Sequence, residues 1–211
     1  IFENVPARLK FLKSNNVENK NSLQIIKKIA LGHPEIKFLY KFEGNLSHVY
    51  KKENFNNEGF KQRILEVFQD DFFLNSLLVE NKIQSDLGDI KLRGFISIPS
   101  YNKVNQSYQF LFVNGRPVQD RGLSAVIRLS YRDTLPRGRH PLYCLMLDLS
   151  NDQIDVNVHP TKLEVKFQNY EFLKSFVITS ITKALQIKNN NKISKNFNIS
   201  EISNNVLSHK N

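Results

Sequence analysis

Apolar positions in the first part of the chain switch from helical spacing to strict alternation. Pro6 favours the first turn of a helix in the segment VPARLKFLKS. Apolar residues then recur with helical spacing from Leu23 to Ala30, and this helix should end near Gly32. Apolar and polar residues alternate in KFLYKF and again after the turn signal at Gly44, so this stretch predicts a β-hairpin.

The rest of the pattern predicts strands between helices. A helix is expected over FKQRILEVF, a second from Arg121 to about Tyr131, and a third from Tyr170 to about Ile187, capped by Asn169. Strands are expected at LLVENKI, DIKLRGFISI, YQFLFV, 142–149, 154–158 and 163–167. The Asn-Gly pair in FVNGRPV is the signal of a two-residue hairpin turn after YQFLFV. The pattern therefore indicates an α+β protein.

Composition divides the chain into parts. The polar stretch KKENFNNEG is typical of a connection and predicts a domain boundary near residue 58. The second domain would cover residues 59–188. Residues 189–211 are rich in Asn, Lys and Ser, with too few apolar residues to fold alone, and we expect them to begin a flexible linker. The chain has the character of a fragment of a longer protein.

Composition also limits the kind of protein. The 211 residues, 40% of them hydrophobic, are enough to bury a core. There is no apolar run long enough for a membrane span and no signal-peptide pattern at residue 1, so we expect no membrane partner and a cytoplasmic location. The single cysteine, Cys144, lies in the apolar run LYCLMLDL and should be a small buried residue. It cannot form an internal disulfide or a cysteine-type zinc site.

The net charge of +10 and the pI near 9.6 favour a polyanionic partner, although solvated surface lysines are the alternative. In the helix after Asp120, three arginines should form one outward row: Arg121, Arg128 and Arg132. The apolar residues Leu123, Val126 and Ile127 fall on the opposite side. The basic loop PRGRHP follows. We expect contacts with a nucleic-acid backbone, independent of sequence and without base stacking, from Arg121, Arg128, Arg132, Arg137 and Arg139. A solvated helix face remains the alternative interpretation.

Other candidate sites are weaker. Lys162 lies in HPTK, where Pro160 should interrupt the strand pairing and project the lysine. A surface lysine is the simpler interpretation of this position. His159 lacks neighbours at metal-ligand spacing, and Arg116 is a residue just past a turn. Three aspartates fit strand exteriors and a turn: Asp148, Asp152 and Asp155. The residues alone show no active site and no metal site.

Three blocks carry a specific resemblance: FVNGRPVQDR, YRDTLPRGRHP and DVNVHPTKLEVKF. Their order resembles that of the MutL family of DNA mismatch repair proteins, over about Phe2 to Leu185. The resemblance implies that residues 1–58 end a GHKL-type ATPase domain. It further implies that residues 59–188 form a transducer domain, with the two-layer α/β fold of some ribosomal proteins and a left-handed βαβ crossover.

The resemblance also implies roles for individual residues. Lys162 matches the lysine that reaches the γ-phosphate of ATP, and Arg121 matches an arginine implicated in DNA binding. Arg8 falls in a family segment from which this chain departs at Glu3, Val5 and Leu9. The full-length parent would use ATP and Mg²⁺, whereas no cofactor is expected for this chain alone, which lacks the family's nucleotide-binding motifs.

As partners, the resemblance implies DNA, a second copy of the parent, and mismatch-recognition and downstream repair proteins. The parent would bind and slowly hydrolyse ATP, dimerise its amino-terminal arms and coordinate repair. Two alternatives stay open at this point. One is the transducer domain of a type II DNA topoisomerase, which shares the fold. The other is a ribosomal-type RNA-binding protein, which needs the charge but not Lys162.

Overall fold

The computed structural model describes residues 4–43, 45–54, 56–68, 70–84, 88–155 and 166–186. Contacts within the chain divide it into two compact units, Ile1–Leu74 and Asn75–Asn211. This division falls later along the chain than the domain boundary expected near residue 58, because the helix that follows residue 56 packs within the first unit. The family's own domain boundary stays a prediction.

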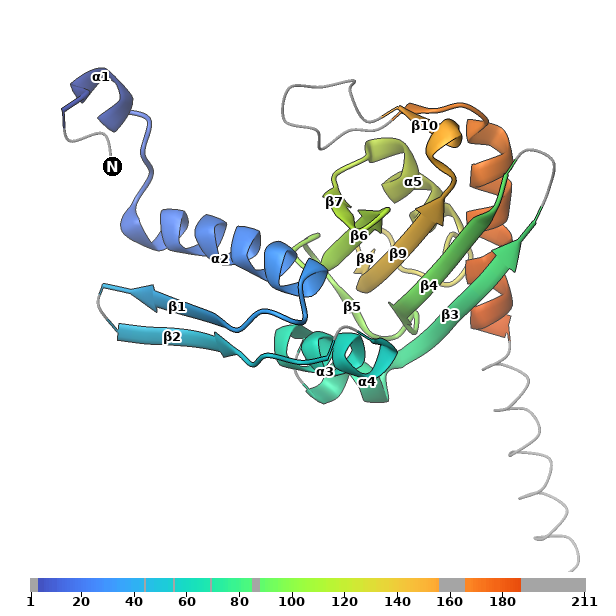
Figure 1. The fold of residues 1–211 in the computed structure, drawn as a ribbon, viewed down its shortest axis with the longest axis horizontal. Coiled ribbons are helices and arrows are strands. Elements are labelled where there is room, and N and C mark those ends of the chain that lie inside the picture. The colour runs from blue at the N-terminus through green and yellow to red at the C-terminus, as the bar shows by residue number, and fades with distance from the viewer. Residues whose placement is uncertain are drawn as a thin grey trace, which may run out of the picture. The chain divides into compact units, whose positions relative to one another are not determined.

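The first unit contains helices and one hairpin (Figure 1). Its elements are α1 (Pro6–Leu9), α2 (Asn15–Gly32), β1 (Phe38–Phe42), β2 (Asn45–Tyr50), α3 (Asn57–Phe68) and α4 (Asp70–Leu74). The predicted hairpin is confirmed, since β1 and β2 pair antiparallel. Helix α2 ends at Gly32 as expected but begins earlier, at Asn15. Helix α3 begins inside the stretch expected to be a connection, because the Asn56 side chain accepts a hydrogen bond from the Gly59 amide at 2.8 Å.

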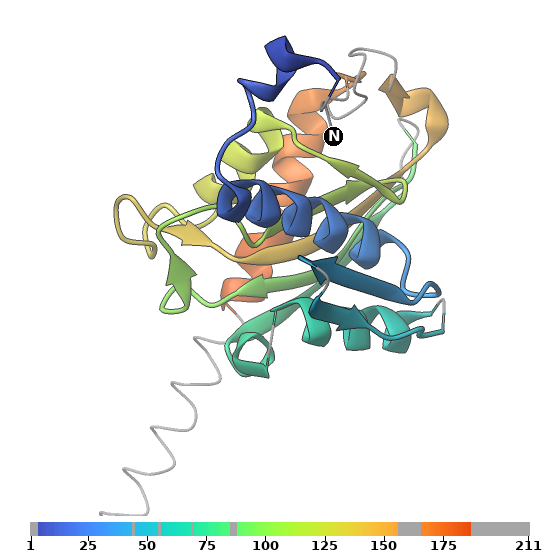
Figure 2. The same cartoon turned by 90° about the vertical axis from the view of Figure 1, so that its left-hand side faces the viewer.

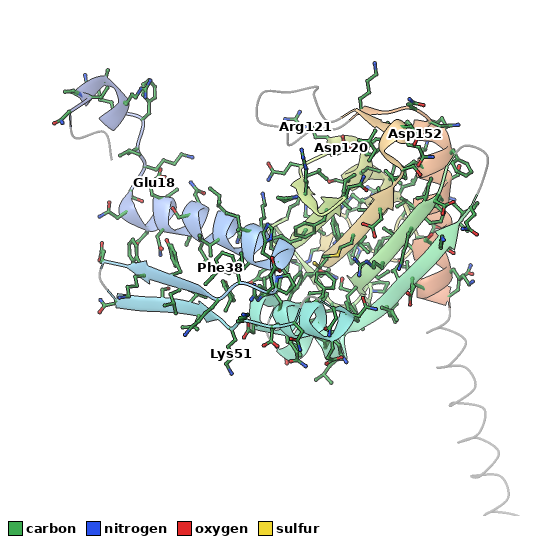
Figure 3. The ribbon with its side chains drawn as sticks, in the orientation of Figure 1. Glu18, Phe38, Lys51, Asp120, Arg121 and Asp152 are labelled. Atoms are coloured by element: carbon green, nitrogen blue, oxygen red, sulfur yellow. The ribbon has the colours of Figure 1, made fainter. Side chains whose placement is uncertain are left out.

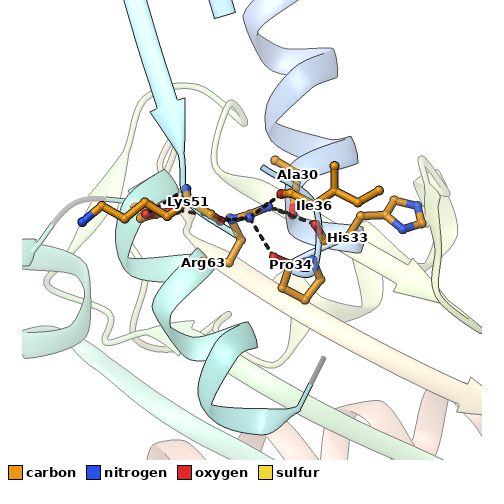
Figure 4. A network of polar contacts seen from close by, with 7 residues as sticks. Ala30, His33, Pro34, Ile36, Lys51 and Arg63 are labelled. Atoms are coloured by element: carbon orange, nitrogen blue, oxygen red, sulfur yellow. Dashed lines mark hydrogen bonds and ion pairs between the residues drawn. The ribbon is translucent and has the colours of Figure 1, made fainter. Parts of the chain in front are cut away.

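A buried arginine holds this unit together (Figure 4). Arg63 of α3 is fully buried and its guanidinium donates to five backbone carbonyls, those of Ala30, His33, Pro34, Ile36 and Lys51. Its Nε lies 3.3 Å from a Glu66 carboxylate oxygen. The carbonyls belong to the end of α2, the loop after it and the residue that follows β2. One side chain therefore satisfies backbone groups that would otherwise be buried without partners.

The second unit is built on a five-stranded sheet. Its strands stand in the order β3 (Ser76–Ile83), β4 (Ile90–Ser97), β9 (Tyr143–Leu149), β6 (Gln109–Val113) and β7 (Arg116–Val118). Strands β6 and β9 are parallel, and the other neighbours are antiparallel. The parallel pair requires a crossover, which contains α5 (Arg121–Leu129). The predicted mixed α+β fold is confirmed, and the hand of the crossover stays a prediction.

Two helices cover one face of this sheet (Figures 1 and 2). They are α5 and the helix over residues 170–186, and together with the sheet they bury a single apolar cluster. The sheet contributes alternate residues such as Leu92, Leu111 and Leu145, while α5 contributes Val126 and Ile127. The alternation matches the pleat, in which every second side chain points to the same face. The Asn169 side chain accepts from the Phe172 amide at 3.2 Å, which confirms the predicted cap.

Shorter elements complete the unit. A two-stranded ribbon pairs β5 (Asn102–Lys103) with β8 (His140–Pro141), and the sequence pattern did not predict β5. The remaining elements are η1 (Asn151–Gln153), β10 (Ile154–Asp155) and β11 (Lys166–Phe167), of which β10 and β11 pair. The Asn-Gly turn joins β6 to β7, with Asn114 at φ 47° and Gly115 at φ 76°. These positive angles are those of a type I′ turn, so the predicted hairpin is confirmed.

For the described residues, the structure can be checked for membrane-spanning helices and for groups of metal ligands. No helix among them is long and apolar enough to cross a membrane. They also contain no group of three or more His, Cys, Asp or Glu side chains that could hold a metal ion. Cys144 is buried in β9 and free, as predicted, and burial raises the pKa of its thiol.

Candidate nucleic-acid interface

Helix α5 is fixed at its start and along its inner face. The Asp120 carboxylate accepts a hydrogen bond from the Leu123 amide at 2.7 Å, which is the N-cap arrangement. The apolar side chains of Leu123, Val126 and Ile127 are at most 4% exposed and pack in the core of the second unit. The predicted amphipathic helix is therefore confirmed, and its docking decides which arginines remain at the surface.

Arg121 lies at the exposed start of this helix (Figure 3). Within the part of the chain that the structure describes, no hydrogen-bond or ion-pair partner reaches its guanidinium. The carboxylate of its neighbour Asp120 already accepts the capping hydrogen bond from the Leu123 amide. Arg121 therefore presents an uncompensated charge with five N–H donors, in the fork geometry that suits phosphate.

Arg128 does not share this outward position. It is half-buried, and one guanidinium nitrogen donates to the backbone carbonyl of Arg139 in the loop that follows the helix. The same nitrogen lies 3.4 Å from His140 Nδ1. The expected outward row of three arginines is therefore wrong at Arg128, because the loop folds back onto α5 and takes up part of its hydrogen-bonding capacity.

The remaining arginines differ in exposure and in the polar partners of their guanidinium groups. Arg132 is exposed beyond the end of α5, 3.3 Å from the Asp133 carboxylate. Arg137 is exposed. Arg139 is half-buried and donates to both the side chain and the backbone carbonyl of Asn102, which anchors the basic loop to β5. Of the five candidate arginines, only Arg121 and Arg137 thus combine exposure with freedom from polar partners among the described residues.

A hollow of about 660 Å³ opens beside Arg121, and we call it the Arg121 hollow. Residues of β6, β7 and α5, of the loop before β6 and of β8 and β9 surround it. It is lined by Gln106, Gln109, Leu111, Val118, Gln119, Asp120, Arg121, Ser124, Ala125, Arg128, His140 and Tyr143. Two arginines stand against one carboxylate, so the hollow attracts anions.

His140 lines this hollow, where its surroundings disfavour the charged form of its imidazole. Burial, and then the charge of Arg128, lower the pKa of its imidazole. Both polar atoms near its Nδ1 are donors: the Arg128 guanidinium and the Gln106 amide nitrogen, each at 3.4 Å. Nδ1 must therefore act as the acceptor, which places the proton on Nε2.

Sequence patterns did not find the glutamines of the hollow. Gln106 and Gln109 come from the loop before β6 and from β6 itself, and Gln119 precedes α5. The Gln109 amide donates to the Pro141 carbonyl at 2.9 Å, which leaves its oxygen unused by that contact. No spacing along the chain distinguishes them, because only the pairing of β5 with β8 and the docking of α5 bring them together.

Other candidate residues lie apart from the hollow or outside the described residues. Lys162 and His159 fall within residues 156–165, which the structure does not describe, so the proposed ATP contact of Lys162 stays a prediction. Asp148 lies on a strand exterior, as expected, with a carboxylate oxygen 3.6 Å from Arg93 Nε. Arg116 is exposed at the start of β7.

Comparisons with known proteins agree with one another. Residues 64–186 match the family described as "DNA mismatch repair protein, C-terminal domain". The "DNA mismatch repair protein MutL" of Rickettsia bellii (strain RML369-C) is 39% identical over 189 residues, which cover 89% of this chain and 30% of that protein. The protein of the same description from Rickettsia canadensis (strain McKiel) is 40% identical over 189 residues, with the same coverage. The chain thus spans 30% of the length of these relatives.

Two solved structures are similar. The crystal structure of the N-terminal domain of a DNA repair protein has a TM-score of 0.73 at 24% identity, covering 89% of this chain and 60% of that one. The Aquifex aeolicus MutL ATPase domain complexed with ADP has a TM-score of 0.50 at 30% identity, covering 71% of this chain and 50% of that one. The first likeness supports the fold.

Proposed function

The chain belongs to the MutL family of DNA mismatch repair proteins, and from this premise we propose that its second unit supplies a DNA-binding surface to a longer repair protein. Membership favours this function over that of a topoisomerase transducer or a ribosomal RNA-binding protein. The surface holds DNA through its phosphates and does not select a sequence, because phosphate contacts carry no base information.

One observation carries this proposal. Arg121 projects its guanidinium, free of polar partners among the described residues, from a capped and docked helix beside a hollow with a surplus of positive charge. A rigid helix holds the charge in place before DNA arrives, so little conformational entropy is lost on binding. Arg137 and Arg132 extend the positive surface along the exposed turn after α5, and Arg128 and Arg139 hold the basic loop in position.

The experiment compares two charge reversals that change the net charge equally. Arg121→Glu removes the proposed contact, while Lys183→Glu alters an exposed lysine on the helix over residues 170–186. Arg121→Glu should weaken binding to unrelated DNA duplexes about equally and lower the slope of log affinity against log salt by about 0.9. Lys183→Glu should have a much smaller effect. Equal effects of the two variants on affinity and slope would contradict the proposal.

For the longer protein we further propose ATP binding and slow hydrolysis with Mg²⁺, and dimerisation of its amino-terminal arms. Lys162 would reach the γ-phosphate of ATP. Family membership and the ADP bound by the Aquifex aeolicus MutL ATPase domain support the nucleotide. The described residues of this chain offer no metal-ligand cluster, so we assign none of them to a step of hydrolysis. A cytoplasmic location and contacts with mismatch-recognition and downstream repair proteins are part of the same proposal.

The nucleotide proposal has its own test. The 211-residue chain alone should release no phosphate from ATP above background. In the full-length parent, Lys162→Ala should weaken ATP binding by about 10- to 150-fold, the range for one charge-assisted contact of roughly 1.5–3 kcal/mol. Unchanged ATP affinity and turnover in that variant would exclude the assignment of Lys162.

A further inference from the structure

We propose that the Arg121 hollow receives one unpaired nucleobase of a bound DNA strand, with the adjoining phosphate at Arg121. This inference rests on the proposed DNA binding and adds to it the part of the strand that the hollow recognises. Its consequence is that the chain distinguishes a strand with unpaired bases from a strand that offers only sugar and phosphate.

The size and lining of the hollow carry the first step. Its volume, about 660 Å³, lies within the range of sites for small molecules and is far more than one phosphate needs. Aliphatic side chains of Leu111, Val118 and Ala125 stand among the polar ones. A phosphate alone makes no use of an aliphatic wall. A ligand with a charged end and a flat, weakly polar body can pack that body against the aliphatic side chains. A nucleotide has this composition.

The polar groups provide the second step. Gln106, Gln109 and Gln119 line the hollow, and Gln119 has no polar partner among the described residues. The oxygen of Gln109 is not used by the bond that its amide nitrogen makes to Pro141. A glutamine amide carries a donor and an acceptor side by side, which matches the edge of a base, adenine above all. Phosphate offers acceptors only, so the amide oxygens have no role in an anion site.

The charges provide the third step. Arg121 and Arg128 line the same hollow as these amides, while Asp120 is engaged there as the helix cap. The phosphate of a nucleotide unit can therefore lie at the exposed Arg121 while its base enters toward the amides. A base within a duplex is stacked and paired and cannot enter a recessed site without leaving the helix. The expected occupant is thus an unpaired nucleotide of a strand.

The experiment uses the 211-residue chain and two fluorescent single strands of about eight nucleotides, a length within the usual site sizes of single-strand binders. One strand is made of deoxyadenosines, and in the other every base is replaced by an abasic residue. The wild-type chain should bind the deoxyadenosine strand about three- to tenfold more tightly, the value of one or two hydrogen bonds. Equal affinities for the two strands would overturn the inference.

Variants separate this inference from the DNA proposal itself. Ala125 is exposed on α5, so Ala125→Phe should fold normally while filling the hollow, and the ratio of the two affinities should fall to about one. Leu129→Phe adds a ring one turn further along α5, outside the hollow, and should keep the wild-type ratio. Arg121→Glu should weaken both strands by a similar factor. An unchanged ratio in a well-folded Ala125→Phe variant would contradict the site.

Three further outcomes are decisive. If neither strand binds the wild-type chain, the proposed DNA binding fails and the inference with it. If binding persists and depends on Arg121 but the ratio is one, only the inference fails. Deoxyadenosine monophosphate serves as the probe for a free nucleotide. Displacement of the strand by micromolar monophosphate would assign the hollow to a free nucleotide and overturn the assignment to a DNA strand.

Discussion

The side-chain amide of Asn114 makes two hydrogen bonds to the backbone of Leu149, one through its nitrogen and one through its oxygen. Asn114 Nδ2 donates to the Leu149 carbonyl at 2.9 Å, and Asn114 Oδ1 accepts from the Leu149 amide at 2.8 Å. Asn114 also occupies the left-handed region of the hairpin turn, at φ 47°. The side chain thus pairs with the backbone as a neighbouring strand would, and it joins the β6 to β7 turn to the end of β9.

Asn114→Gly should therefore lower the free energy of unfolding by about 1–3 kcal/mol, the sum for two hydrogen bonds. Glycine tolerates the positive φ, so the loss reports the side-chain bonds and not backbone strain. Urea denaturation would measure it. Asn105→Gly is the control, since the Asn105 side chain accepts one exposed bond from the Ser107 amide. A loss no larger than that of the control would show that the bonds to Leu149 contribute little.

Gly94 should tolerate no side chain. Its φ is 138°, and an added Cβ would lie 2.1 Å from the Cys144 carbonyl oxygen of the neighbouring strand. Gly115 also has a positive φ, 76°, but apart from its chain neighbours no atom of the described residues lies within 4 Å of its Cβ position. Gly115→Ala should cost about 1–2 kcal/mol of stability from backbone strain alone, whereas Gly94→Ala should cost several kcal/mol. Similar denaturation midpoints for the two variants would contradict this difference.

Arg63 should be essential for the stability of the first unit. Arg63→Met leaves five carbonyls without their donor and should cost about 3–5 kcal/mol, as for other broken buried charge networks. Glu66→Gln, which keeps those bonds, should cost far less. Hydrogen exchange of amides in α2 and α3 would locate the loss in this unit. Exchange rates equal to those of the wild type in Arg63→Met would exclude the proposed role.

Tyr143 should make the stability of the second unit fall at high pH. Burial raises the pKa of its hydroxyl to about 12, and the Ser124 hydrogen bond acts in the opposite direction. The unfolded chain releases this proton near pH 10, so the contribution is complete below pH 10 and is lost as the pH rises to about 12. The loss should total roughly 3 kcal/mol. Urea titrations at several pH values should show a shallower decline in Tyr143→Phe, and identical declines would contradict the assignment.

Local patterns were sufficient for the longer elements. The alternation in β4, the cap at Asn169 and the Asn-Gly turn each depend on residues close together in the chain, so they could be predicted before any contact was known. The two-residue strands β5 and β8 could not, because so short a segment shows no period. The start of α3 was missed because its polar residues resemble a connection until Asn56 caps them.

The sequence by itself determined the family, the positive charge, the docked face of α5 and the exposure of Arg121, since these follow from motif order, composition and helical period. Only the tertiary structure decided that Arg128 donates to the loop after α5 and that Arg63 donates to carbonyls of three segments. It also decided that three glutamines line the hollow beside Arg121. Each of these depends on contacts between residues far apart in the chain. Such contacts arise from how the elements pack, and no local period or spacing encodes them.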